Sequence, residues 1–208
     1  GRIVADAVAD PENPPPMPIL IRATARLRKR LRQPVKPPEP AVPPDNPLGE
    51  WYADIDFLDR EPFVLLLNAA TGAGMVLPGR AADLRGLHLH AQRQLALLLA
   101  YYGFDPAGPL CEAELQAWAV PPVYAATRDR SLLGSMNQFK DMTWHHFAYV
   151  DRSLPEAASR QWEGLFRHPD LARTRKRYDY TAWQRPLDLV AARLLPAGLV
   201  VPVRGTEH

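Results

Sequence analysis

The chain has 208 residues, 47% of them hydrophobic, and a formal net charge of +2. This length allows one main domain with a sizeable core, and no run approaches the ~20 apolar residues that cross a bilayer. The single cysteine, Cys111, excludes an internal disulfide and a Cys-x-x-Cys metal motif, and the N-terminus has no signal-peptide pattern. We therefore expect a cytoplasmic protein that does not enter membranes.

The N-terminal part begins with a stretch that we exclude from the fold. Residues 1–16 are proline-rich and aperiodic, so we expect them to be disordered or left over from cloning. The fold is predicted to begin with a short strand at 18–22 and a helix that Thr24 caps and Pro34 ends.

The predicted first helix is strongly basic. Residues 22–36 contain seven basic residues and no acidic one. Such a run is a candidate surface for nucleic acid or an acidic protein. The residues that we expect to make these contacts are Arg26, Arg28, Lys29 and Arg30.

A proline-rich linker precedes a predicted sheet. Seven of the fourteen residues in 34–47 are proline, which favours an extended, mobile connector without regular structure. The period-two pattern of 51–58 predicts a half-buried strand. A turn at 59–62, an apolar run at 63–67, turn residues at 68–74 and a last strand at 75–77 complete a meander.

Two long helices and two shorter ones are predicted after the meander. Apolar residues three or four apart predict one helix over 83–102, which Gly103 ends. A strand at 123–126 leads into a second long helix from about residue 132 to 147. Shorter helices are predicted at 155–166 and 187–195.

These elements predict an α+β fold. We expect a small, mostly antiparallel sheet of about four or five strands packed with two main helices. The predicted domain covers residues 17–150, with the linker at 34–47 inside it. Residues 151–208 are predicted to form a helical C-terminal extension.

Several motifs in this order resemble an uncharacterised bacterial and phage domain family of unknown function. They are Ile19-Leu-Ile-Arg-Ala-Thr24, Leu48-Gly-Glu-Trp-Tyr52, Leu58-Asp-Arg60, Asn68 with Thr71, and Leu133-Gly-Ser-Met-Asn137. The resemblance covers roughly residues 17–147 and implies the element order given above, but no activity. Gln138 departs from it, because an acidic residue is usual there, and the proline-rich linker looks like an insertion.

The stretch before and within the second long helix is a candidate anion site. Ser131 is a plausible N-cap, and two arginines precede it. A helix N-terminus beside cationic side chains suits a phosphate or a carboxylate. The predicted anion-binding residues are Arg128, Arg130, Ser131 and Asn137. We expect Gly134 to serve packing, by letting the helix approach a neighbour.

The C-terminal part carries a second basic run with aromatic residues in it. Phosphate contacts and base stacking need this mixture, although the aromatic residues could equally anchor a helical segment. The candidate residues for nucleic acid or an acidic partner are Arg173, Arg175, Lys176, Arg177 and Tyr178.

The spacing of the remaining polar residues disfavours a metal site, a catalytic nucleophile and a nucleotide site. Asp54 and Asp56 share a strand face that we expect to be solvated, although they could bind a hard cation. The pairs His88/His90 and His145/His146 are badly spaced for one metal, and no serine nucleophile elbow or phosphate loop is present. We therefore predict no metal, no cofactor and no catalytic residues.

The function that we expect is a non-enzymatic intracellular binding module whose basic surfaces engage nucleic acid or an acidic protein. One alternative is an enzyme that acts on a phosphorylated or nucleotide substrate near Arg128, Arg130 and Ser131. Another is a structural or docking subunit of a larger assembly, in which the linker and the tail are docking segments.

Overall fold

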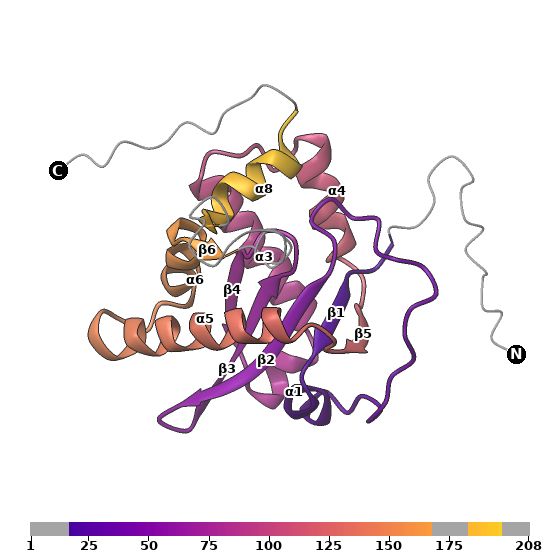
Figure 1. The fold of residues 1–208 in the computed structure, drawn as a ribbon, viewed down its shortest axis with the longest axis vertical. Helices are drawn as coiled ribbons and strands as arrows, with labels where there is room; N and C mark the ends of the chain where they lie inside the picture. The colour runs from indigo at the N-terminus through magenta and orange to yellow at the C-terminus, as the bar shows by residue number, and fades with distance from the viewer. Residues whose placement is uncertain (1–16, 168–182, 197–208) are drawn as a thin grey trace, which may run out of the picture.

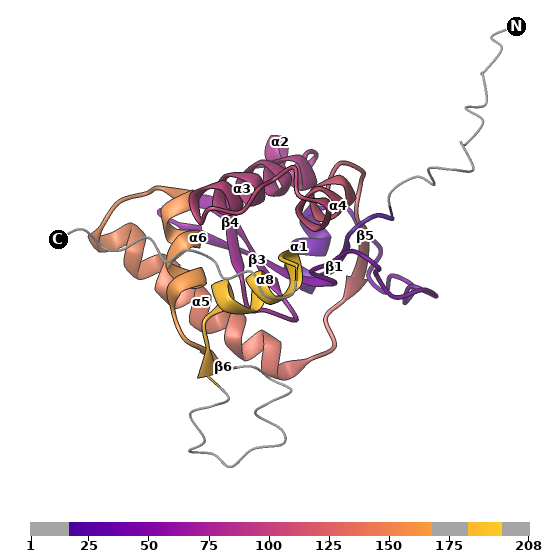
Figure 2. The ribbon, with the colours of Figure 1, turned by 90° about the horizontal axis from the view of Figure 1, so that it is seen from above.

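A computed structural model describes residues 17–167 and 183–196, and the structural statements below concern these residues. Figures 1 and 2 show a central sheet with helices on both faces. In chain order the elements are β1 (Leu20–Ala23), α1 (Ala25–Arg30), β2 (Trp51–Leu58), β3 (Glu61–Asn68), β4 (Gly74–Pro78), α2 (Ala81–Leu84), α3 (Leu87–Tyr101), α4 (Pro109–Ala117), β5 (Val123–Ala126), α5 (Arg130–Tyr149), α6 (Leu154–Glu163), β6 (Phe166–Arg167), β7 (Trp183–Gln184) and α8 (Pro186–Leu194).

The main sheet has five strands in the order β4-β3-β2-β1-β5. β2, β3 and β4 form the predicted antiparallel meander. β1 pairs in parallel with both β2 and β5, so the sheet is mixed, and its antiparallel pairings are the longer ones. The predicted α+β class is confirmed, and β6 and β7 form a separate short ladder.

Successive side chains of β2 point to opposite faces of the sheet, and a different layer of helices covers each face. Trp51 contacts Trp118 beside α4 edge to face, with ring centroids 5.5 Å apart. On the opposite face, Asp54 accepts a hydrogen bond from Lys140 of α5 at 2.9 Å. α5 therefore crosses one face of the sheet, and α3 and α4 lie against the other (Figure 2).

The outer edge of β4 is closed by side chains from two helices. Gln94 of α3 bonds both the N–H and the C=O of Val76, at 2.8 and 2.6 Å. On α6, the Trp162 indole donates to Gly74 O at 2.9 Å. These contacts satisfy backbone groups that would otherwise offer an open edge to another strand.

The proline-rich segment has no helix or strand between residues 34 and 47, as predicted. Its end is fixed to α4, because buried Glu114 accepts hydrogen bonds from Asn46 Nδ2 at 2.8 Å and from Leu48 N at 2.9 Å. Its middle is fixed by Glu39, which pairs with Arg22 of β1. The mobility of the segment stays a prediction.

Three details of the predicted helices are wrong. The helix expected over 83–102 is two helices, α2 and α3, which separate near Gly86. α4 was not predicted. Gly134 does not serve packing, because a Cβ placed there would have no atom of a neighbouring element within 4 Å.

The C-terminal helices agree with the sequence-based expectation. α6 lies within one residue of the predicted start and ends three residues early, and α8 is shifted by one residue. Within the described ranges no helix is both long enough and apolar enough to span a bilayer. The expected extension at 1–16 lies outside the described residues.

Candidate functional site

Two of the four basic residues predicted on α1 are engaged within the domain. Arg28 is buried and donates to Ala23 O at 2.5 Å and to Val35 O at 3.1 Å. Arg26 forms ion pairs with Asp54 and Asp56 of β2, at 3.6 and 3.3 Å. Carboxylates therefore neutralise Arg26, whereas backbone carbonyls hold the buried Arg28 side chain without a counter-ion among the described residues.

The other two predicted residues face solvent. Lys29 and Arg30 are exposed and form no ion pair with any residue in the described part of the chain. The Arg30 guanidinium lies 4.7 Å from the centre of the Phe57 ring of β2. This cation–π contact orients the side chain without neutralising its charge.

Arg30 lines a hollow of about 340 Å³ together with two further arginines. Arg32 follows α1 in the chain, and Arg85 follows α2. The remaining lining residues are Leu31, Ala81 and Leu84. Neither Arg32 nor Arg85 is ion-paired within residues 17–167 and 183–196, so three unneutralised guanidinium groups surround one hollow, which we call the arginine pocket.

Arg32 also has an unusual backbone conformation. Its φ is +55°, in the left-handed region where the residue after a helix is usually glycine or asparagine. The N–H of the next residue, Gln33, bonds Arg28 O at 2.9 Å and closes the helix end. Strain of this kind tends to concentrate at functional sites.

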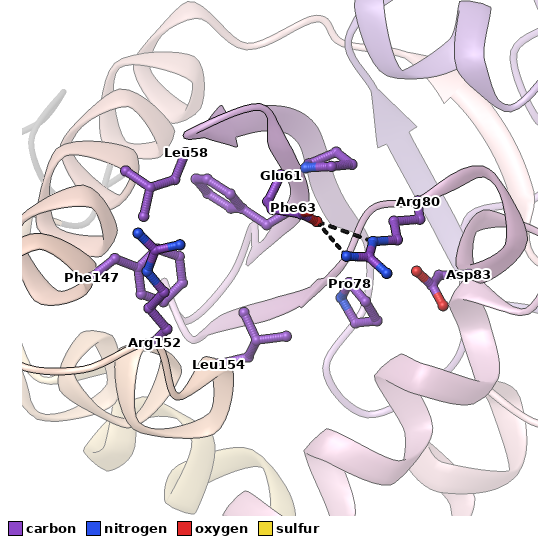
Figure 3. A pocket seen from close by; sticks show the side chains of 10 residues that line it. Leu58, Glu61, Phe63, Pro78, Arg80, Asp83, Phe147, Arg152 and Leu154 are labelled. Atoms are coloured by element: carbon purple, nitrogen blue, oxygen red, sulfur yellow. Dashed lines mark hydrogen bonds and ion pairs between the residues drawn. The ribbon is translucent and has the colours of Figure 1, made fainter.

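A second, larger hollow of about 630 Å³ differs in its electrostatics (Figure 3). Its two arginines lie on opposite sides of an apolar floor that includes Phe63. Both are paired: Arg80 with Glu61 at 2.8 Å and Arg152 with Asp59 at 2.5 Å. Because these charges are already neutralised, this hollow is a weaker candidate for an anion than the arginine pocket.

The predicted N-cap of α5 is wrong by two residues. Asp129, and not Ser131, caps the helix, because its carboxylate accepts from Ser131 N at 2.8 Å and from Leu132 N at 3.3 Å. A carboxylate of the chain itself thus occupies the helix N-terminus, which does not favour a second anion there.

The arginine before that cap is also neutralised. Arg128 forms ion pairs with Glu39 at 3.2 Å and with Glu50 at 3.4 Å. Arg130 and Asn137 lie exposed on α5. The structure thus brings Arg128 to two glutamates and does not gather the four predicted residues around an open hollow; an anion at this place stays a prediction.

The aspartates of β2 do not form a solvated face, and this expectation is wrong. Asp54 is 8% exposed beneath α5 and accepts from Thr24 Oγ1 at 2.6 Å. Lys140 bonds the same carboxylate and lies 3.8 Å from Asp56. Cationic side chains thus already neutralise both carboxylates.

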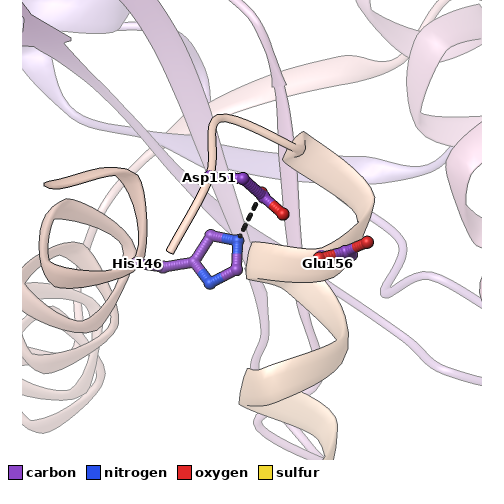
Figure 4. Close-up of side chains that lie close together, drawn as sticks. All are labelled: His146, Asp151 and Glu156. Atoms are coloured by element: carbon purple, nitrogen blue, oxygen red, sulfur yellow. Dashed lines mark hydrogen bonds and ion pairs between the residues drawn. The ribbon is translucent and has the colours of Figure 1, made fainter. Parts of the chain in front are cut away.

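His146 lies near two carboxylates, those of Asp151 and Glu156 (Figure 4). Spacing along the sequence pairs His146 only with its neighbour His145 and does not predict this grouping. His146, 2% exposed, has Nε2 3.0 Å from Asp151 Oδ1, and a carboxylate oxygen of Glu156 lies within 4.8 Å of both. Asp151 also accepts from Ser153 N at 2.7 Å, so it closes the corner between α5 and α6. The Ser153 N–H, followed by Glu156 and His146, holds the pKa of Asp151 below its usual range.

The second predicted basic cluster lies outside the described residues. It consists of Arg173, Arg175, Lys176, Arg177 and Tyr178. The arginine pocket itself was only partly predictable. Arg32 belongs to the basic run of 22–36, but only the fold places Arg85, at the end of α2, on the same hollow as Arg32.

A comparison with protein families gives a match over most of the chain. Residues 20–178 match the family described as a domain of unknown function, DUF6933. The match agrees with the resemblance seen in the sequence and continues past residue 147 through α6. A comparison with curated proteins gives no match.

Proposed function

Because the chain belongs to the DUF6933 family, whose description names no activity, we propose a function from its surface chemistry. The protein is a non-enzymatic module that binds the phosphate groups of nucleic acid through the arginine pocket. Arg30, Arg32 and Arg85 supply the contacts, and exposed Lys29 adds to the positive field.

The observation that carries this proposal is the unneutralised charge of the pocket. Six other described arginines pair with carboxylates: Arg22, Arg26, Arg80, Arg128, Arg152 and Arg185. Further exposed arginines also form no ion pair within the described residues, so the distinguishing feature of Arg30, Arg32 and Arg85 is that all three line one hollow. Three guanidinium groups around one hollow repel one another until an anion binds. Arginine matches phosphate with paired hydrogen bonds, so a phosphate satisfies this arrangement well.

The strained backbone at Arg32 supports the same proposal. A glycine there would adopt the left-handed conformation without strain, whereas an arginine holds a cation at the rim of the pocket at a cost of roughly 1 kcal/mol.

The expected binding is electrostatic and weakly dependent on base sequence. α1 has six residues and packs on the sheet through Leu27, so it is not a free recognition helix. Contacts to phosphates fix position but carry no sequence information. An acidic protein would offer carboxylates to the same arginines, and the experiment below therefore includes one.

The test is a binding titration of the full chain with fluorescently labelled single-stranded and duplex DNA at about 50 mM salt, where phosphate contacts are strong. We expect binding to wild type and a loss of at least tenfold in the triple variant R30Q/R32Q/R85Q. Polyglutamate of equal charge serves as a competitor. Polyglutamate binding in place of DNA binding would show an acidic partner and overturn the nucleic-acid proposal.

The matched control removes the same total charge elsewhere. Arg160, Arg167 and Arg193 are exposed on α6, β6 and α8, at the other end of the molecule from α1 (Figure 1). The variant R160Q/R167Q/R193Q should keep most of the affinity. Equal losses in the two triple variants would mean that net charge, and not the pocket, determines binding.

A further inference from the structure

Arg22 of β1 is the most deeply buried cation of the described chain and has two very different counter-ions. Its side chain is 1% exposed. Its Nε donates to Glu50 Oε2 at 2.7 Å, and its Nη1 donates to Ala126 O at 3.1 Å. The outer end of the guanidinium is held by both carboxylate oxygens of Glu39.

The two glutamates differ in how firmly the fold holds them. Glu50 lies directly before β2, and its side chain is 18% exposed. Glu39 belongs to the irregular proline-rich segment, and its side chain is 56% exposed. Among residues 36–45, Glu39 alone forms hydrogen bonds or ion pairs with the described chain. One carboxylate therefore fastens this whole stretch to the domain.

Arg128 completes a cradle around that carboxylate. It is 62% exposed and reaches Glu39 at 3.2 Å from the solvent side. Without Glu39, the remaining charges of Arg22, Arg128 and Glu50 sum to +1, and two guanidinium groups face the vacated position. Arg22 would keep Glu50 as a counter-ion, but two guanidinium groups with a net charge of +1 at the vacated position favour an anion there.

We propose that Arg22 and Arg128 form an oxyanion-binding site that Glu39 fills as an internal ligand. A carboxylate or phosphate group of another molecule presents the same pair of acceptor oxygens and competes with Glu39 for the site. Its binding releases residues 36–45 from the domain. This site is separate from the arginine pocket, and the proposal does not depend on nucleic-acid binding.

The test compares wild type with E39Q, which removes the charge of Glu39 and keeps a side-chain oxygen that accepts from Arg22. Both proteins are titrated with sodium phosphate and, separately, with sodium acetate at constant ionic strength, and the backbone amide signals are followed by NMR. While Glu39 occupies the site, an added anion cannot bind there. The apparent affinity for the anion is therefore the intrinsic affinity multiplied by the fraction of molecules in which the site is free. We expect E39Q to bind about tenfold more tightly or better, with shifts around Arg22 and Arg128.

Two further variants separate a site from a general charge effect. Glu61 is 57% exposed and pairs with Arg80, so E61Q matches E39Q in charge and exposure. E61Q should behave as wild type, and E39Q/R128Q should lose the gain. Preference for acetate or for phosphate identifies the kind of ligand, and either supports the proposal. Equal affinity in wild type and E39Q, or no binding to E39Q at tens of millimolar anion, overturns it.

Discussion

Arg32 combines an exposed cation with a backbone conformation that suits glycine. Its φ of +55° lowers the stability of the fold, whereas its place on the rim of the arginine pocket favours anion binding. Substitution by glycine removes the strain and the guanidinium together, although a glycine also loses more backbone entropy on folding.

R32G should therefore keep or raise the free energy of unfolding, by up to about 1 kcal/mol, while weakening DNA binding. Urea denaturation and DNA titration of the same preparation measure the two quantities. R32A is the control, because alanine removes the guanidinium but keeps the strain. A clear loss of stability in R32G, or unchanged DNA affinity, would show that Arg32 has a purely structural role.

Asp151 links the end of α5 to the start of α6 and makes that corner sensitive to acid. The Ser153 N–H, and then Glu156 and His146, lower the pKa of its carboxyl in the folded state. A carboxyl with a lowered folded pKa stabilises the protein above its unfolded pKa of about 3.9, and this contribution is lost as the pH falls through the folded pKa.

D151N should reduce stability at pH 7 and should lose less stability than wild type on acidification below about pH 4. Urea denaturation at pH 7 and pH 3 measures both effects. D141N serves as the comparison, since Asp141 is exposed on α5 and has no hydrogen bond or ion pair with the described residues. Parallel pH profiles for D151N and wild type would contradict this role.

At the scale of the element, α5 contains an interior glycine that its packing does not require. No atom of another element lies within 4 Å of the position that a Cβ at Gly134 would take. The buried face of α5 is formed instead by Leu132, Met136 and Phe139.

G134A should raise the free energy of unfolding by roughly 0.5–1 kcal/mol, because alanine loses less backbone entropy than glycine in a helix. Thermal or urea unfolding measures this change. Gln138 is exposed on the same helix, and Q138G should have a destabilising effect of similar size. Destabilisation by G134A would indicate a contact of Gly134 that the described residues do not make.

The elements with a clear period were predictable from the sequence. Alternation along 51–58 and the apolar run at 63–67 correspond to β2 and β3. Thr24 caps α1, where its side chain accepts from Leu27 N at 3.4 Å. α4 was missed because its anchor is a charged residue: Glu114 is fully buried, and only its hydrogen bonds to Asn46, Leu48 and Trp118 permit this. Burial raises the pKa of this carboxyl.

The candidate site was less predictable, because neutralisation depends on distant residues. Arg26 belongs to the same basic run as Arg30, yet only the fold places Asp54 and Asp56 beside Arg26. The sequence shows the number of basic residues, whereas anion binding depends on which of those residues have no counter-ion in the fold.

At the scale of the whole molecule, the net charge of +2 does not show which arginines are ion-paired and which are not. Six of the described arginines pair with carboxylates of their own chain, whereas Arg30, Arg32 and Arg85, at the ends of α1 and α2, form no ion pair with described residues and line one hollow together. The proposed function therefore assigns polyanion binding to a local surface and not to the total charge.

The salt dependence of DNA binding tests this claim most directly. Each phosphate contact contributes about −0.9 to the slope of log K against log salt for duplex DNA. Wild type should therefore show a slope that is steeper than that of R30Q/R32Q/R85Q by about 2 to 3, while R160Q/R167Q/R193Q keeps a slope close to wild type. Identical slopes for wild type and R30Q/R32Q/R85Q would contradict the assignment of the arginine pocket as the phosphate-binding surface.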